Sequence, residues 1–385
     1  MGVSCMEKRD MANSRNVWQK VFAGTWLGEA RSVRETKDKG YICTGYTVSE
    51  RRTDFDIKVV KLDASGNLVW EKTFGGEFHE RSYSVQQTSD GGYVVAGYTM
   101  SFGAGGRDVY VLKLDANGNT LWERTFGGSG DDVAHSIQQT SDGGYIVGGY
   151  TESFGTSGKN IYVLKLDADG KRVWERTFKG TGDDMAHSVQ QTSDGGYILA
   201  GRTRSLDTGH KEACVIKLDA KGDLVWQSTF SGTGDSIAFC VQETTDGGYI
   251  VAGVADSVGV GSSISVLKLN ASGQLQWQKT YGGNTDNEAY SVQQTRDGGY
   301  IVAGYSGSLG FGAEVSAYVL KLNADGQVEW ERILVGGGND VARCVQQTSD
   351  GGYVVAGYTG VIGVYDFAYI VKMDAYGETD PYPLE

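Results

Sequence analysis

Ser141-Asp142-Gly143-Gly144-Tyr145 is the centre of a unit that the chain contains in seven copies. The first copy has diverged from this pattern and reads Lys37-Asp38-Lys39-Gly40-Tyr41. Successive tyrosines of this cluster stand 51 to 53 residues apart, as Tyr41, Tyr93, Tyr145, Tyr197, Tyr249, Tyr300 and Tyr353. A fixed period of this length is typical of architectures in which each repeat packs against the next. Seven such units fill most of the 385 residues, so the sequence predicts one large repeat domain.

Each unit is expected to form four short antiparallel strands. In the third copy we expect them at 135–140, 145–151, 161–166 and 173–178, with Asp-Gly-Gly making the first hairpin turn. The second and third strands are apolar at successive positions, as in a sheet covered on both faces. The first strand contains small residues, whereas the fourth contains Trp174 and Phe178. This gradient in size is expected of a blade that widens outward from an axis. The predicted fold is therefore an all-β, seven-bladed β-propeller of four-stranded blades.

The two ends of the chain complement each other. Residues 18–22 (WQKVF) match the fourth strand of a unit, whereas the last unit stops after its third strand, at 368–374. This arrangement predicts a ring closed by the N-terminal strand, which completes the last blade and removes the exposed end blades. The predicted propeller spans 17–376, with a flexible leader at 1–16 and a tail at 377–385.

Composition excludes several classes of partner. The formal net charge of −13 disfavours nucleic acid and anionic membrane surfaces. No run approaches 18 apolar residues, so no membrane span is expected. The five cysteines are scattered without a CxxC motif, and four of them replace ordinary repeat residues, which indicates core residues rather than disulfides or a zinc site. With no apolar signal core in 1–15, these features predict a cytoplasmic monomer.

The repeat resembles known propeller families. Tyr145-Ile146-Val147-Gly148-Gly149 with a later Tyr and Trp resembles kelch propellers, and the run from Leu166 through Asp169-Gly170 to Trp174 is similar to the tryptophan-docking motif of quinoprotein propellers. Over 17–376 the chain looks most like prokaryotic tandem-repeat propellers that are largely uncharacterised and often exported. The resemblance implies a propeller and a secreted or cell-surface location. It implies no particular activity, and no cofactor is expected.

The loops of the unit divide between two faces of the ring. The turns between first and second strands, and between third and fourth, are short and share one face, the short-turn face. The longer loops share the other face of the ring, the long-loop face. They connect the second strand to the third, and each unit to the next. Asp142 and Asp167 are predicted to cap their own turns through side-chain-to-backbone hydrogen bonds. The recurrent turn motif is therefore expected to be structural.

Acidic residues recur in the loops between units. They are Asp131, Asp132, Asp183, Asp184, Asp235, Asp286 and Asp340. A ring of carboxylates would hold Ca²⁺ or attract a cationic partner at the channel mouth. The favoured alternative is that each aspartate caps its own loop, because no loop has the dense DxDxDG spacing of a calcium site.

One position near the start of the first strand varies while its neighbours do not. It is occupied by Arg31, Tyr83, His135, His187, Phe239, Tyr290 and Arg343. By the repeat symmetry these side chains surround the channel mouth, and aromatic and arginine side chains bind sugars, peptides or carboxylates. Packing of each against the next blade is an equal alternative. Two histidines without a third ligand do not make a zinc site, and no nucleophile motif accompanies them, so no catalytic residue is predicted.

The sequence thus favours a non-enzymatic binding or scaffold propeller. It would hold a protein, peptide or glycan at the long-loop face and channel mouth. The alternative is a hydrolase or lyase that uses the acidic and histidine residues there, with assistance from Ca²⁺.

Overall fold

One repeat unit forms one antiparallel sheet in the computed structural model. Strand β10 (Asp132–Gln139) pairs with β11 (Tyr145–Thr151), β11 with β12 (Asn160–Leu166), and β12 with β13 (Arg172–Phe178). Gly143, at φ +81°, supplies the turn between β10 and β11. Strands β11 and β12 are buried along their whole length, as their continuous apolar sequences indicate. The predicted strands are confirmed, but β10 begins at Asp132, three residues earlier than expected.

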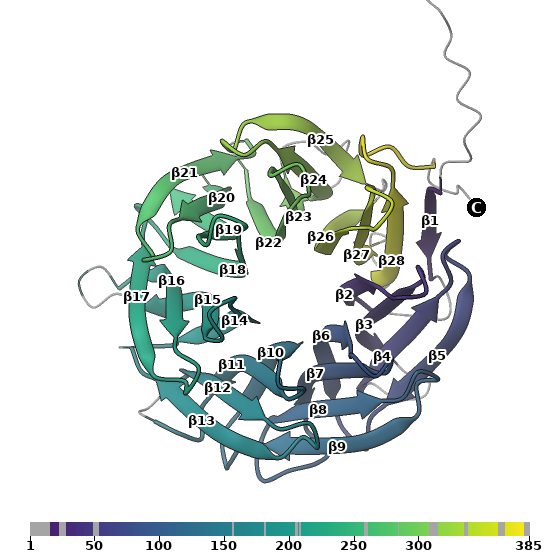
Figure 1. Cartoon of the computed structure of the whole chain (residues 1–385), viewed down its shortest axis with the longest axis vertical. Coiled ribbons are helices and arrows are strands. Elements are labelled where there is room, and N and C mark those ends of the chain that lie inside the picture. The colour runs from purple at the N-terminus through teal and green to yellow at the C-terminus, as the bar shows by residue number, and fades with distance from the viewer. Residues whose placement is uncertain are drawn as a thin grey trace, which may run out of the picture.

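Seven such sheets surround a central axis (Figure 1). From inner to outer strand, they are β2 (Ala30–Glu35), β3 (Tyr41–Val48), β4 (Phe55–Leu62), β5 (Leu68–Phe74); β6 (Glu80–Gln87), β7 (Tyr93–Thr99), β8 (Asp108–Leu114), β9 (Thr120–Phe126); β10 to β13; β14 (Met185–Gln191), β15 (Tyr197–Arg204), β16 (Lys211–Leu218), β17 (Leu224–Phe230); β18 (Ser236–Glu243), β19 (Tyr249–Ser257), β20 (Gly261–Leu269), β21 (Leu275–Tyr281); β22 (Asn287–Gln294), β23 (Tyr300–Ser306), β24 (Ser316–Leu322), β25 (Val328–Leu334); and β26 (Asn339–Gln347), β27 (Tyr353–Gly360), β28 (Asp366–Met373), β1 (Trp18–Val21). The seven-bladed prediction is confirmed.

The structure describes residues 16–22, 28–48, 54–155, 158–180, 182–204, 207, 209–257, 261–283, 285–307, 315–334, 338–360 and 366–380. Of the predicted leader and tail, only residue 16 and residues 377–380 lie within these ranges. Within them no helix is long and apolar enough to cross a membrane.

The ring closes through the N-terminal strand, as predicted. Strand β1 runs antiparallel to β28, with Trp18 opposite Lys372 and Val21 opposite Tyr369. Figure 1 shows the purple β1 beside the yellow β28, so the first and last parts of the described chain share one blade. The Trp18 indole N–H also donates to the Ala64 carbonyl of the adjacent blade at 3.4 Å. Closure therefore ties the last blade to the first.

Each outer-strand tryptophan packs on the next blade. Trp122 lies edge-on to Tyr145, with ring centroids 5.8 Å apart, and covers Gly170. Gly170 has φ +74°, and a Cβ there would lie 2.7 Å from the indole ring, so both the turn and the contact require glycine. The equivalent pairs are Trp18–Gly66, Trp70–Gly118, Trp174–Gly222, Trp226–Gly273, Trp277–Gly326 and Trp330–Gly377. The recurrent Asp-Ala-x-Gly turn is thus half of a contact between blades.

The aspartate of each Ser-Asp-Gly-Gly turn neutralises a buried lysine. Asp142 caps its own turn by accepting from the Gly144 N–H at 3.0 Å and the Thr140 hydroxyl at 2.5 Å. It also lies 2.9 Å from the Nζ of Lys165, whose side chain is 6% exposed. The same pairs are Asp38–Lys61, Asp90–Lys113, Asp194–Lys217, Asp246–Lys268, Asp297–Lys321 and Asp350–Lys372, at 2.9 to 3.0 Å. A buried ammonium needs such a partner, which explains why the turn recurs.

These ion pairs predict a loss of stability in acid. Burial alone would raise the pKa of Asp142, but hydrogen bonds from Thr140, Lys165 and Gly144 outweigh it and lower this pKa to about 2. The pKa values of Asp90, Asp194 and Asp246 are lowered to about 2 by the same balance. A folded-state pKa below the usual value of about 4 stabilises the fold above that pH and ceases to do so as the pH falls toward 2. We expect the urea midpoint, followed by tryptophan fluorescence, to drop between pH 4 and 2; a constant midpoint would contradict this.

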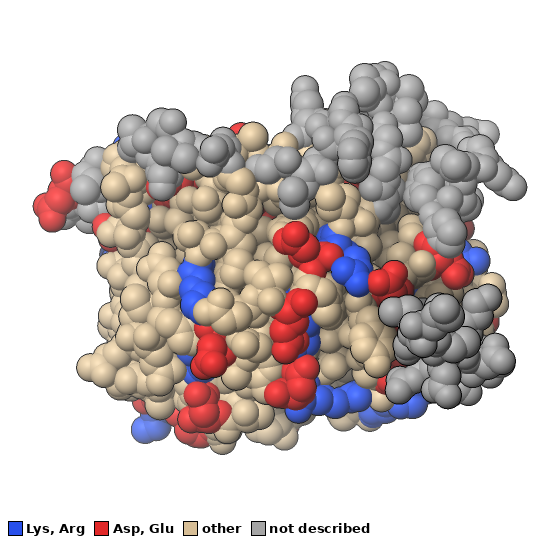
Figure 2. Space-filling view, turned by 90° about the horizontal axis from the view of Figure 1, so that it is seen from above, with Lys and Arg blue, Asp and Glu red and all other residues tan. Residues whose placement is uncertain are grey.

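Charged side chains are mixed on the side of the ring that Figure 2 shows. Lysine and arginine lie among aspartate and glutamate there, rather than gathering by sign. The expectation that nucleic acid is not a partner rests on the net charge of −13 and stays a prediction.

Candidate functional site at the channel mouth

Every inner strand contains a β-bulge near its start. In β10 the pairing passes from Ala134 opposite Gly149 to Ser136 opposite Gly148, which leaves His135 without a partner on β11. A bulge bends its strand and re-aims the side chain that it carries. The seven bulge residues are Arg31, Tyr83, His135, His187, Phe239, Tyr290 and Arg343. The structure therefore places all seven variable residues within the inner strands, and we call them the mouth ring.

A glycine of the second strand makes each bulge possible. A Cβ at Gly149 would lie 1.8 Å from the carbonyl oxygen of Val133, two positions before the bulge residue. The equivalent glycines, Gly45, Gly97, Gly201, Gly253, Gly304 and Gly357, would place a Cβ 1.8 to 1.9 Å from the corresponding carbonyl. The constant glycine thus fixes the backbone, and the bulge residue is left free to vary.

The mouth ring is continuous through its aromatic members. The centroid distances are 5.1 Å from Tyr83 to His135, 5.0 Å from His135 to His187, 5.0 Å from His187 to Phe239 and 5.0 Å from Phe239 to Tyr290. These are ordinary distances for interacting aromatic rings. The packing alternative is therefore correct in geometry, because each member contacts the next blade. All five are nevertheless partly exposed.

The two arginines close the ring around one carboxylate. The guanidinium of Arg31 lies 5.4 Å from the Tyr83 centroid, and that of Arg343 lies 4.3 Å from the Tyr290 centroid. Between them, Glu29 Oε2 lies 2.6 Å from Arg31 Nε and 3.5 Å from Arg343 Nε. The mouth therefore has two different sides: an uncharged aromatic arc and a charged segment with two cations and one anion.

The two histidines of the arc are neutral at neutral pH. Burial lowers the pKa of His135 to about 4, although its Nδ1 is 2.9 Å from the Ala186 carbonyl oxygen, a contact that favours the protonated ring. Burial and the neighbouring His135 lower the pKa of His187 well below its usual range. The stacked pair, 24° from parallel, thus acts as aromatic surface rather than as a source of positive charge.

Sequence reasoning missed the residues that support the ring. Tyr98 and Tyr150, on the second strands, contact Tyr83 and His135. Glu29, which bridges the two arginines, stands two positions before the bulge. That position also varies, as Glu29, Arg81, Val133, Met185, Ile237, Glu288 and Val341. Alignment of the seven copies at this position is the signal that would have found Glu29.

The predicted carboxylates of the long-loop face are distributed among separate loops. Asp132 accepts from the Gly128 N–H and the Ser153 hydroxyl, and Asp184 from the Gly180 N–H and the Thr203 hydroxyl. Both side chains are buried, as is Asp340. These contacts are the loop caps that were proposed as the alternative to a metal site.

Three of the remaining acids of that set bind the preceding blade. Asp131 accepts from the Arg107 N–H at 2.9 Å, Asp235 from the Lys211 N–H at 2.9 Å, and Asp183 from that of Lys159 at 3.3 Å. The backbone carbonyl of Asp286 accepts from the Gly307 N–H. Among the residues that the structure describes, no three or more His, Cys, Asp or Glu gather in a way that could hold a metal ion.

We expect neither Ca²⁺ nor EDTA to change the melting temperature by more than about 1 °C. Oδ2 of Asp132 and both carboxylate oxygens of Asp184 already accept hydrogen bonds, and a ligand stabilises a fold only by binding it. Differential scanning calorimetry in each additive, at one ionic strength, makes the measurement. A rise of several degrees with Ca²⁺ that EDTA reverses would restore the metal hypothesis.

The fold and the mouth ring together define a closed seven-bladed propeller with one variable side chain at the bulge of each inner strand. A family model described as outer membrane protein assembly factor BamB matches residues 9–193 and 158–368, so the chain belongs to that family. The tandem-repeat resemblance is thereby confirmed as membership of a propeller family. The finer likenesses to kelch propellers and to the tryptophan-docking motif of quinoprotein propellers stay predictions.

One curated relative is the regulatory protein FlaEY of Caulobacter vibrioides. It is 24% identical over 351 residues, which cover 80% of this chain and 35% of the relative. The chain therefore spans about a third of that protein's length.

Solved structures share the fold. The Pan2 WD40 domain of Neurospora crassa has a TM-score of 0.56 at 11% identity and covers 89% of each chain. A puromycin hydrolase S511A mutant has a TM-score of 0.54 at 14% identity, over 92% of this chain and 55% of that one. Identities this low show the propeller fold alone.

Proposed function

We propose that this protein is a non-enzymatic binding propeller that holds a protein or peptide partner at the mouth ring. The observation that carries the proposal is the contrast between constant and variable positions. The turns, the tryptophans and the glycine beside the bulge recur with the contacts that build the blades, whereas the bulge residue differs from blade to blade. Side chains that vary on a fixed backbone are where a partner would be recognised.

The chemistry of the mouth ring suits a peptide. Tyrosine and arginine are the residue types that contribute most to binding energy at protein interfaces. The aromatic arc offers Tyr83, Phe239 and Tyr290 as apolar contacts, and Arg31 and Arg343 offer guanidinium groups for carboxylates. The family description, an assembly factor for outer membrane proteins, supports a protein rather than a glycan as partner. A glycan is the other outcome of the test.

The test is selection of peptides from a random display library on the immobilised protein, with a glycan array in parallel. We expect the double variant Tyr83→Ala/Tyr290→Ala to lose binding of the selected peptides at least tenfold, since each removes an aromatic contact worth about 1 kcal/mol or more. The matched control is Tyr376→Ala, which removes a 65% exposed aromatic side chain from the short-turn face. Selected peptides that bind the double variant as they bind the unchanged protein would refute the proposal.

A hydrolase or lyase remains the second hypothesis, and no described contact favours it. The neutral histidines stack on each other, and Asp132 and Asp184 cap loops. Loss of turnover on alanine substitution of His135 and His187, for any substrate found, would favour this class over a binding protein.

A further inference from the structure

A second ring of side chains lines the channel beyond the mouth ring, three residues further along each inner strand. It consists of glutamine in six blades and arginine in one: Arg34, Gln86, Gln138, Gln190, Gln242, Gln293 and Gln346. With the small residues Ser84, Ser136, Ser188, Cys240 and Ser291, they line a cavity of about 150 Å³. A cavity accommodates a water molecule from roughly 10–15 Å³, so this one has room for an anion of several atoms.

Contacts between blades fix which way the glutamine amides point. The Gln139 backbone N–H donates to Gln86 Oε1 at 2.6 Å, and the Glu35 N–H donates to Gln346 Oε1 at 2.8 Å. The amide oxygens of Gln138, Gln242 and Gln293 accept from the next blade in the same way, at 2.5 to 2.6 Å. A backbone N–H can only be met by the oxygen of an amide. In these five glutamines the NH₂ group is therefore the end left to donate into the channel.

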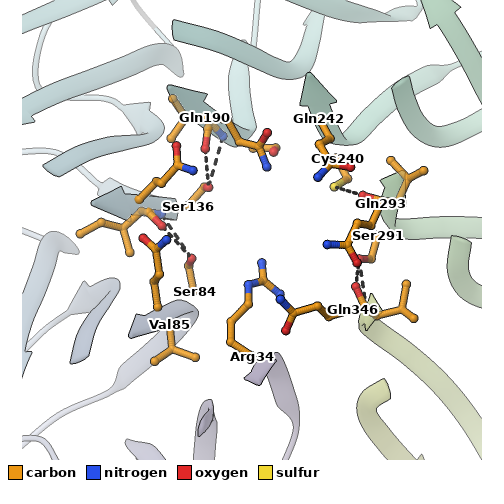
Figure 3. A pocket seen from close by; sticks show the side chains of 17 residues that line it. Arg34, Ser84, Val85, Ser136, Gln190, Cys240, Gln242, Ser291, Gln293 and Gln346 are labelled. Carbon is orange, nitrogen blue, oxygen red and sulfur yellow. Dashed lines mark hydrogen bonds between the residues drawn. The ribbon is translucent and has the colours of Figure 1, made fainter. Parts of the chain in front are cut away.

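Arg34 adds a positive charge to this ring of donors. Its Nη1 donates to the Val33 carbonyl at 2.8 Å and contacts Cys344 Sγ at 3.0 Å, which holds the guanidinium in the channel. Among the described residues, no carboxylate lies within ion-pair distance of it. Figure 3 shows Arg34 extending from β2 toward the middle of the cavity, with Gln346 and Gln293 reaching in from other blades.

The acids nearest along the inner strands are already engaged. Glu35 accepts from the N–H and the hydroxyl of Ser349, at 2.7 and 2.6 Å. Glu243 accepts from the N–H and the hydroxyl of Ser193, at 2.7 and 2.8 Å. Both glutamates therefore bind the turn of the preceding blade. The second ring, which consists of Arg34 and the six glutamines, presents a cation and amide donors to the channel. A partly desolvated cation surrounded by donors favours an anion.

We propose that the channel binds one small free oxyanion, of the phosphate or sulfate type, between Arg34 and the amide groups of its ring. The guanidinium supplies the charge and two parallel N–H donors that match the edge of an oxyanion. The glutamines on either side supply neutral donors around the remaining oxygens. This site is separate from the mouth ring and does not depend on the proposed peptide binding.

The test is isothermal titration calorimetry of the full chain with sodium phosphate and with sodium sulfate, against sodium chloride at equal ionic strength. The decisive variant is Arg34→Gln, which gives the first blade the residue of the other six and is expected to fold. We expect one oxyanion per chain and at least about tenfold weaker binding in Arg34→Gln, because one charged hydrogen bond contributes roughly 1.5–3 kcal/mol. Arg34→Lys keeps the charge without the fork and should bind with intermediate affinity.

The control Lys171→Gln removes one exposed positive charge from the outer rim and should bind as the unchanged protein does. Unaltered phosphate and sulfate binding in both Arg34 variants would overturn the proposal. Heats for phosphate and sulfate that equal those for chloride in the unchanged protein would overturn it as well.

Discussion

Deletion of residues 1–22 is expected to lower the free energy of unfolding by at least about 5 kcal/mol and to expose the edge of the last blade. It removes β1, leaves the outer edge of β28 unpaired and uncovers Gly66, on which the Trp18 indole lies. Trp18 is 7% exposed, and Trp18→Ala alone should cost about 3–5 kcal/mol, the usual cost of truncating a buried tryptophan. Urea unfolding followed by circular dichroism makes the measurement, with size-exclusion chromatography to detect association through the free edge.

Complementation provides the control for this deletion. A synthetic peptide of residues 1–24 added to the truncated chain should restore most of the lost stability, because the edge of β28 that pairs with β1 remains. The same peptide carrying Trp18→Ala should restore much less. If the truncated chain unfolded with the midpoint of the full chain, the N-terminal strand would not be what closes the ring.

Asp142→Ala is expected to destabilise the protein by about 2 kcal/mol. It leaves the Lys165 ammonium, 6% exposed, without its counter-ion and removes the cap of the turn. Breaking a fully buried pair costs about 3–5 kcal/mol, and the value here is smaller because the Asp142 side chain is 62% exposed. The measurement is chemical denaturation at pH 7, with Asp169→Ala as the control, an exposed aspartate of another turn expected to change stability by less than about 0.5 kcal/mol.

The double variant Asp142→Ala/Lys165→Met isolates the interaction between the two side chains. Removing both charges leaves no uncompensated ammonium. The double variant should therefore be about 1 kcal/mol more stable than the single variant Asp142→Ala. Equal stability of the double and single variants would mean that Asp142 acts only as a turn cap, and that the recurrence of the turn needs another cause.

Much of the fold could be predicted because each level of the sequence agrees with the others. The repeat period, the apolar second and third strands and the complementary ends all indicate a closed seven-bladed ring, which the structure confirms. The partner of Asp142 could not be predicted, because Lys165 stands in an otherwise apolar strand and its ammonium reaches the turn only once the sheet has formed. From the local sequence alone, a lysine in that position looks like a polar residue that interrupts an apolar strand, although it recurs in every copy.

The variation between the seven copies identifies the residues of the mouth ring. The sequence alone does not predict their geometry. The sequence shows that the bulge position differs between copies, whereas the bulge itself follows from the clash that any side chain at Gly149 would make with the Val133 carbonyl. Such a contact spans two strands and carries no local pattern beyond the constant glycine. Likewise, Arg34 reads as one substitution in a row of glutamines. The role of Arg34 in the proposed oxyanion site depends on the amide orientations that neighbouring blades impose on the glutamines.

The central claim is that recurrent residues hold the blades together and that recognition takes place at the mouth ring. Hydrogen–deuterium exchange of the protein with and without a peptide selected on it tests this most directly. We predict protection of the segments around the bulges, such as 132–137 and 288–292, with unchanged exchange in the Ser-Asp-Gly-Gly turns. Protection confined to those turns would place the partner on the short-turn face and contradict the account.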